Sequence, residues 1–489
     1  MFKSLTLSAG AHETIIIIIA IFCFLYVIFF AIQKPIFSVY AFLIFWIFVP
    51  NAMAGFGEYI NFHDLITTIG AISIIIVYFT RISRGFPMYG RKREWHISVK
   101  DRYLVKCFIL LSLISIGSTA LFIYMGYFAS VDIVLFIKNN LSLLNGVLFF
   151  FGCRFFITDV RHVNTIFRIF FLAGIYLLIE YILCFKLGLI PAIGNYVRST
   201  AGYGEVQFSL ILNSHIRVAM ILLMSIPSGL YLWMQNKSMA YLILTILFFI
   251  PLFETVSRAA FFGGCISFCC YMLFQRRMKI RSVIQVGAIL LLLVFIFAYF
   301  GEKGAEFLQD ATIPKYKLGY DSALTRLGGY LRATEIFFYG FPIGVGEGLS
   351  PHNCLNSKIP YLFGDIITNP LVMLTYKYKP TIPHNIVVRL IVEHGVFGAA
   401  MLILYIISLV KNYIRYNYYK SKIAGSRVNQ QSDNIMDATY AALFGLFCFH
   451  MFDAVHMLYF VYGVLLVFSF AAVSLIKMEA LRSINSKKG

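Results

Sequence analysis

Two neighbouring polar residues, His384 and Asn385, stand directly before a long apolar segment and are followed by two glycines at a defined spacing. Nine residues separate Asn385 from Gly395, and two more separate Gly395 from Gly398. At the edge of a bilayer, a histidine is a titratable group and an asparagine can orient a sugar hydroxyl. The glycine pair is a small-residue spacing that would let another helix approach closely. The pattern predicts a candidate active site here; the alternative is an interfacial histidine before an ordinary packed helix.

Several arginines could bind an anion at the same surface. Arg258 follows Ser257 in a short turn between two apolar segments, where a charged side chain needs a partner. The planar guanidinium binds phosphate oxygens in pairs and keeps its charge, which suits a diphosphate. The alternative for each is an arginine that extends to the lipid headgroups. The further candidates lie in predicted outer loops or at the outer end of a span: Arg198, Arg217, Arg326 and Arg332.

Three weaker motifs accompany these residues. A second Pro-His-Asn triplet contains His352, but Phe363 stands where the first glycine should follow. The glycines between Gly340 and Gly348 follow no parallel strand, so we interpret them as a tight backbone turn beside the active groups and not as a nucleotide loop. Glu393, about two and a half turns beyond His384, is predicted to satisfy a buried polar group.

His450, Asp453 and His456 cluster near the outer end of the last two spans. Two histidines and one carboxylate without a fourth ligand are a weak metal pattern, so we interpret them as a hydrogen-bonded structural cluster. The sequence therefore predicts neither a metal nor a cofactor.

The composition decides the class of protein. Of the 489 residues, 60% are hydrophobic and only 13% are charged. A spanning helix needs about 20 predominantly apolar residues, and about 12 or 13 segments meet this requirement. We predict an all-α polytopic membrane protein with one large extracytoplasmic loop that carries short helices. The predicted spans begin near Thr14, Ile36, Leu65, Leu104, Ile133, Ile166, Phe208, Met239, Ala259, Val283, Ile386, Ala438 and His456.

The positive charges indicate the orientation. The net charge is +19, but no basic stripe is interleaved with exposed aromatic residues, which disfavours nucleic-acid binding. Short loops rich in Lys and Arg are typical of the cytoplasmic side, so the C-terminus is predicted to be cytoplasmic. The side of the N-terminus depends on the number of spans. The basic groups lie at 81–102, 276–281, 411–427 and 487–488.

Four regions follow along the chain: a transmembrane bundle of about ten spans at 1–300, an extracytoplasmic loop at 301–385, C-terminal spans at 386–476 and a cytoplasmic tail at 477–489. The loop has eight Lys or Arg and seven Asp or Glu, which nearly cancel. Its many glycines, prolines and tyrosines favour an ordered structure over a flexible tether. A long loop with structure of its own is usually functional.

The histidine motif, the Ser257-Arg258-Ala259 turn and the Arg326 to Gly346 approach together resemble the O-antigen ligase and O-antigen polymerase superfamily. The resemblance covers about 200 residues, 198–400. It implies a bacterial inner-membrane glycosyltransferase with a periplasmic active site. The family's essential histidine corresponds to His384 and its arginine after serine to Arg258. Its upstream outer-loop arginine corresponds to Arg198, with Arg217 as a competitor.

The resemblance implies a donor glycan linked to undecaprenyl diphosphate. Arg258, with Arg198 or Arg217, would hold the diphosphate, and His384 would act as general base on an acceptor sugar hydroxyl, with inversion. Arg326 and Asn385 are further candidates for substrate binding. The partners implied are the donor, a glycan or lipid-linked acceptor, the bilayer and a chain-length regulator.

Three functions are compared. A repeat-unit polymerase of a surface polysaccharide is favoured by the chain's length and its large outer loop, which could accommodate two bulky lipid-linked substrates. The alternative is a ligase that transfers the glycan to lipid A–core. A polysaccharide flippase would also have about a dozen spans, but transporters typically show two related halves, whereas this chain has one asymmetric late loop.

Overall fold

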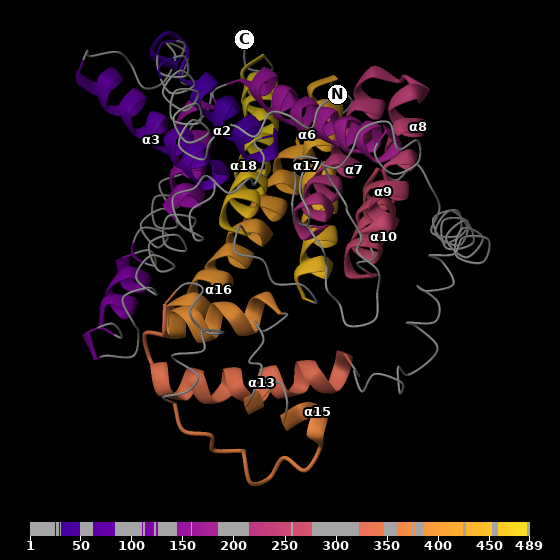
Figure 1. Cartoon of the computed structure of the whole chain (residues 1–489). Helices are drawn as coiled ribbons and strands as arrows, with labels where there is room; N and C mark the ends of the chain where they lie inside the picture. Colours follow the sequence, from indigo (N-terminus) through magenta and orange to yellow (C-terminus); the bar gives the residue numbers. More distant parts are fainter. Residues whose placement is uncertain are drawn as a thin grey trace, which may run out of the picture.

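The structure is a computed structural model in which the described residues are almost entirely helical (Figure 1). Within the described ranges there is no strand, and the protein is an all-α polytopic membrane protein, as predicted. The described residues are 31–48, 62–83, 113–121, 144–157, 159–183, 215–255, 258–275, 322–346, 359–373, 376–377, 385–423, 427–451 and 458–486, with isolated positions at 25, 29, 110 and 124–125.

Four helices in this part of the chain are long and apolar enough to cross a membrane. The four apolar stretches are Val160–Tyr181, Arg217–Asn236, Ile386–Lys420 and Val464–Leu481. Shorter apolar helices accompany them at Ile36–Ile47, Thr67–Ser83, Leu144–Phe156, Met239–Phe253 and Ala259–Phe274. The predicted span near Val283 lies outside the described residues, as do the predicted span starts near Thr14, Leu104, Ile133, Phe208 and His456. The total of 12 or 13 spans therefore stays a prediction.

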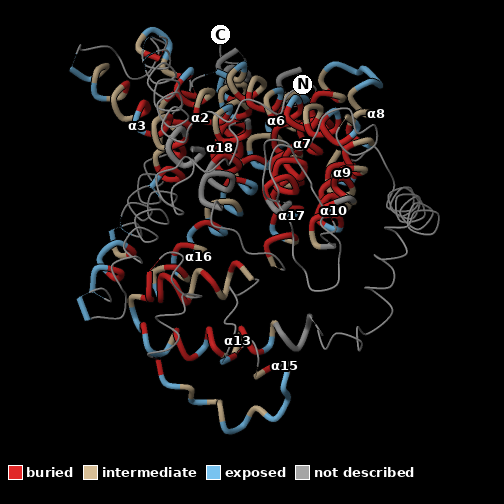
Figure 2. Tube along the Cα trace, in the orientation of Figure 1, coloured by how far each residue is buried: buried red, intermediate tan, exposed pale blue. Residues whose placement is uncertain are grey.

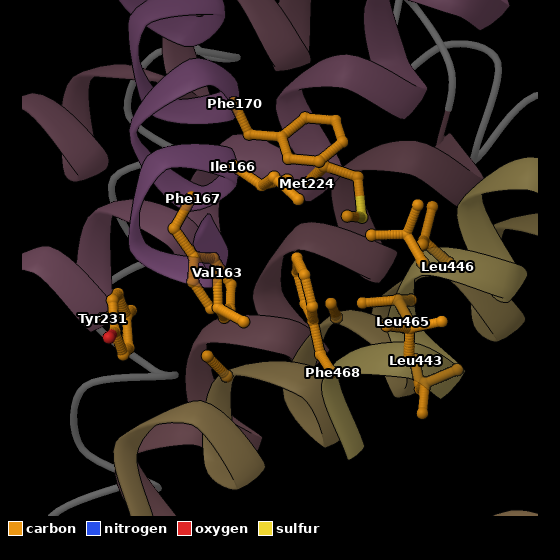
Figure 3. Close-up of a cluster of buried hydrophobic side chains, with 14 of the residues drawn as sticks. Val163, Ile166, Phe167, Phe170, Met224, Tyr231, Leu443, Leu446, Leu465 and Phe468 are labelled. Carbon is orange, nitrogen blue, oxygen red and sulfur yellow. The ribbon is translucent and has the colours of Figure 1, made fainter. Parts of the chain in front are cut away.

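The core of the bundle forms where α6 (Val160–Tyr181), α7 (His215–Asn236), α17 (Arg427–His450) and α18 (Leu458–Ser486) meet (Figure 3). The ring of Phe167 stacks on Tyr231 at 4.3 Å and contacts Phe468 at 4.8 Å between centroids. Large apolar side chains from the four helices thus interdigitate around one point. This packing fixes the positions of the four helices relative to one another.

Helices α2 (Ile36–Phe48) and α3 (Phe62–Ser83) pack together on one side of this core, with α2 also against α6. On the other side, α8 (Met239–Leu247) and α9 (Phe249–Glu254) lead into α10 (Arg258–Phe274). Helix α10 packs along α17 through two glycines, since a Cβ on Gly263 would lie 2.6 Å from the carbonyl oxygen of Gly445. The backbones of α10 and α17 therefore touch, which fixes the height of one helix relative to the other.

A smaller module lies beyond one end of the bundle, opposite the C-terminus (Figure 1). It contains α13 (Ser322–Gly340), α15 (Pro370–Met373) and the first part of α16 (Ile386–Lys420). Its own small core consists of Ala333, Ile336, Val345, Ile359 and Val392. Residues around 360–369 at its outer edge are largely exposed (Figure 2). Short helices in the predicted outer loop are thus present.

Three helices extend further than the hydropathy pattern predicted. Helix α17 begins at Arg427, eleven residues before the predicted start at Ala438, because its polar first turns have partners: Gln275, directly after α10, donates to Asn434 and Asp437. Helix α16 continues through the basic residues predicted to form a loop as far as Lys420. Helix α18 continues to Ser486, so most of the predicted tail at 477–489 is helical.

Candidate active site

Three helices of the bundle begin or end at the same level. Leu223 of α7 and Gly445 of α17 both lie beside Gly263 of α10. Along each helix, roughly 7 to 9 Å separate this contact from a polar residue. These residues are Arg217 on α7, Arg258 at the start of α10 and His450 at the end of α17. The N-termini of α7 and α10 carry partial positive charge, which favours an anion at this end of the bundle.

Asn385 brings the start of α16 to the same place. Its side chain caps the helix, because Oδ1 accepts from the backbone N–H groups of Val387 at 2.9 Å and Val388 at 3.2 Å. The Nδ2 amide donates to the carbonyl oxygen of Met451 at 3.3 Å, directly after α17 ends. Asn385 therefore ties the histidine motif to the end of α17. Its predicted role in substrate binding stays a prediction.

Arg217 occupies the first turn of α7 and is buried, with 7% of its surface exposed. Its guanidinium carbon lies 5.4 Å from the ring centre of Trp46, near the end of α2. The ring quadrupole of an indole attracts a cation placed over its face. Arg217 is thus a fixed cation at this end of the bundle and not a headgroup anchor.

Helix α16 is broken at Gly395, whose backbone adopts φ 59° and ψ −142°. The segment 340–346, which we call the glycine strap, supplies hydrogen bonds at the break. Val345 and Gly346 donate to the carbonyl oxygens of Val392 at 3.2 Å and Glu393 at 2.8 Å, while Val396 donates to Pro342 at 3.0 Å. The predicted close backbone turn of these glycines is confirmed. The predicted helix partner for Gly395 is wrong, because a Cβ there would overlap Pro342 of the strap.

A buried ion pair lies between the cap and the break. Glu393 accepts from Arg389 one turn earlier, with Nε and Oε2 separated by 3.0 Å and both side chains at most 4% exposed. The prediction that Glu393 satisfies a buried polar group is therefore confirmed. His394, next in the chain, is fully buried. This short helix is polar inside, so its packing specifies one orientation of the residues before it.

The two arginines of α13 have different environments. Arg332 is 1% exposed and donates to Glu335 at 2.5 Å and to the carbonyl oxygens of Ile359 at 2.8 Å and Pro360 at 2.9 Å. The prediction that Arg332 lies at the surface to bind phosphate is wrong, because the protein itself surrounds the guanidinium. Arg326 is partly exposed in the early turns of α13 and belongs to the outer module.

Glu335 extends the same network, which sequence reasoning missed. Its carboxylate also accepts from the hydroxyl of Tyr376 and from the backbone N–H of Phe363 at 2.9 Å. Burial, and then the hydrogen bond to Glu335, raise the pKa of the Tyr376 hydroxyl above its usual value. The phenol stays protonated and donates. The i, i+3 spacing of Arg332 and Glu335 was the available signal, but the loop carbonyls could not be read from it.

Several predicted site residues lie outside the described residues: His384, Arg198, Ser257, His352, Asp453 and His456. The structure describes the backbone of Arg258 at the first position of α10. What it brings together is the start of α16, the start of α10, the start of α7 and the end of α17. Arg326 belongs to the outer module.

The O-antigen ligase family model matches residues 240–403. The matched region contains Arg258, α13, the glycine strap, the histidine motif and the break in α16, whereas Arg198 and Arg217 precede it. No curated protein matches the chain. The match covers α10, the outer module and the first part of α16, whereas α7 and α17, which complete this end of the bundle, lie outside it. The chain is thus a multi-pass membrane protein whose residues 240–403 match the O-antigen ligase family, and members of that family are glycosyltransferase-type enzymes.

Proposed function

We propose that the protein transfers a glycan from an undecaprenyl-diphosphate-linked donor to a sugar hydroxyl, with inversion, as the repeat-unit polymerase of a surface polysaccharide. The observation that carries the proposal is the convergence of the starts of α7, α10 and α16 on the end of α17. A glycosyl diphosphate needs positive charge for its leaving group and a base for its acceptor, and this end of the bundle supports both.

In this reaction the acceptor oxygen attacks the anomeric carbon while the bond from that carbon to the diphosphate breaks. The electron pair leaves with undecaprenyl diphosphate, and Arg258 with Arg217 or Arg198 stabilises the growing negative charge. His384 takes the proton of the acceptor hydroxyl. Asn385 supports this assignment, since its cap and its bond to Met451 hold the backbone beside His384. No metal or cofactor is assigned a step.

The proposal includes the place and direction of the reaction. The site lies at the end of the bundle opposite the C-terminus (Figure 1). With a cytoplasmic C-terminus, this end faces the periplasm of a bacterial inner membrane, where the lipid-linked donor is used. A chain-length regulator would be a partner there.

Substitution of Arg258 by lysine tests the phosphate role. An ammonium cannot make the paired contact of a guanidinium, so we expect Arg258→Lys to lose roughly 100-fold in turnover of a synthetic lipid-diphosphate donor in nanodiscs. Arg161→Lys is the matched control, because Arg161 also stands in the first turn of a helix but α6 runs antiparallel to α7 and begins at the opposite end. Near-normal turnover in Arg258→Lys would overturn the phosphate role.

A ligase differs from a polymerase only in its acceptor. The same preparation, supplied with a second lipid-linked glycan or with lipid A–core, separates the two. Extension of the lipid-linked glycan supports the polymerase, and transfer to lipid A–core with no extension supports the ligase.

A further inference from the structure

Besides its bonds to α16, the glycine strap accepts a hydrogen bond from a residue in the N-terminal half of the chain. The hydroxyl of Ser118 donates to the carbonyl oxygen of Gly344 at 2.5 Å, and Ser118 is buried with 2% of its surface exposed. Ser118 lies in the helical residues 113–121, which are 226 positions away from Gly344 in sequence. A hydrogen bond at this distance in sequence joins two parts of the fold that no local interaction connects.

The strap offers Ser118 a defined acceptor because its own backbone is held on both sides. Gly344 adopts φ 79°, and a Cβ at this position would overlap the carbonyl oxygen of Glu393. The N–H of Gly344 donates to Gly340 at 2.8 Å, and the next two N–H groups donate into the break of α16. The carbonyl oxygen of Gly344 accepts from the buried hydroxyl of Ser118.

The segment that carries the histidine motif is held at both ends. At its start, Asn385 bonds to Met451 at 3.3 Å; at its end, the strap bonds to Val392, Glu393 and Val396. Between these two points, the nine residues Ile386–His394 form one uninterrupted stretch of helix. This stretch therefore joins the strap to Asn385.

We propose that Ser118 is a positioning residue: by fixing the strap, it fixes the Ile386–His394 helix and hence Asn385, the residue that follows the proposed base His384 in the chain. This inference rests on the proposed glycosyl transfer for its kinetic consequence only. The attachment of the strap by Ser118 can be measured without any reaction.

Amide hydrogen exchange of the full-length protein in nanodiscs tests the attachment. In Ser118→Ala, one buried hydrogen bond is lost, and exchange at Val345, Gly346 and Val396 should become roughly two- to tenfold faster. Thr119→Val is the matched control, because the Thr119 hydroxyl bonds within its own helix to Ser115 at 3.0 Å. Unchanged exchange in Ser118→Ala, or equal acceleration in the control, would overturn the inference.

Kinetics with the synthetic donor test the positioning role. Ser118→Ala should lower kcat several-fold with little change in the KM for the donor, and Ser118→Thr, which keeps the hydroxyl, should recover most of the loss. Wild-type kcat in Ser118→Ala despite a loosened strap would overturn the positioning role. Failure of the proposed function would be distinct, because Arg258→Lys would then retain turnover while the exchange result stands.

Discussion

Among single residues, Arg217 and Arg332 show how surroundings decide what a guanidinium can do. Arg332 is enclosed by Glu335, by the carbonyl oxygens of Ile359 and Pro360 and by the ring of Tyr361 at 3.9 Å. Its donors are used to hold the outer module together. Arg217 is also buried, but it stands in the first turn of a helix at the bundle end and packs against an indole ring. Of these two arginines, Arg217 is therefore the one whose position at a helix N-terminus agrees with the proposed phosphate role.

His384 carries the sharpest prediction among single residues. We expect His384→Ala to reduce glycan transfer at least about 100-fold, because the acceptor hydroxyl loses its base. Insertion into the membrane should persist, since the residue precedes the helix that starts at Ile386. Polymer or capped lipid is measured on a gel from cells that lack the native enzyme.

The control for this substitution is His352→Ala, because His352 belongs to the incomplete copy of the motif. Its effect should be milder. Product of wild-type length and amount from His384→Ala would remove this histidine from the mechanism.

Among the structural elements, the broken helix α16 connects the membrane bundle to the outer module. From 396 to Lys420 the helix rises about 37 Å, longer than the bilayer core of about 30 Å, whereas Ile386–His394 lies beside α13. An exposed helix break inside a membrane would leave backbone groups without partners. The glycine strap supplies hydrogen-bond partners for the backbone groups at the break. The break is therefore the place where the membrane bundle joins the outer module.

Gly395→Ala tests this junction. Alanine disfavours a positive φ by about 1 to 2 kcal/mol, and its Cβ would also overlap Pro342 of the strap. We expect the strap to detach and transfer activity to be lost. Limited proteolysis should show faster cleavage in the outer module.

Gly117→Ala is the matched control, because a Cβ at Gly117 meets no atom within 4 Å. This variant should keep wild-type activity and protease resistance, or gain slightly in helix stability. If Gly395→Ala were as active and as resistant as Gly117→Ala, the junction would have no part in the reaction.

For the whole molecule, the decisive feature is that helix ends far apart in sequence meet opposite the C-terminus (Figure 1). The described residues at this end of the bundle include the cation Arg217 and the amide Asn385, and the predicted site adds Arg258 and His384 to them. A site of arginines and a histidine should therefore transfer glycan in excess chelator, whereas a carboxylate–metal glycosyltransferase should stop.

This prediction is checked with purified protein in nanodiscs, with the donor, an acceptor and a chelator present. We expect a new glycosidic bond, inverted at the anomeric carbon, and free undecaprenyl diphosphate. Loss of transfer in chelator, restored by a divalent cation, would contradict the metal-independent mechanism. Intact donor moved across the bilayer, with no bond formed by any acceptor, would instead identify a transporter.

The sequence by itself determined the fold class and much of the helix pattern, because burial in a bilayer requires long apolar runs that can be read directly. The predicted starts at Ile36, Met239 and Ile386 agree with the helices, and Arg258 begins α10 one residue before its predicted start. It also determined the role of Glu393, since a carboxylate in an apolar helix must find a partner. The polar first turns of α17 could not be predicted, because they are held by a partner distant in sequence, Gln275 directly after α10.

Only the tertiary structure decided which residues meet. Gly395 and Gly398 have the spacing of a helix-packing pair, but φ 59° at Gly395 makes it a break filled by the strap. The sequence predicted a surface cation at Arg332, but in the structure loop carbonyl oxygens enclose its guanidinium. Asn385 and Met451 are 66 positions apart, and Ser118 and Gly344 are 226 apart. Hydropathy places each residue along its own helix, whereas the height and rotation of one helix against another follow from side-chain packing that no single segment contains.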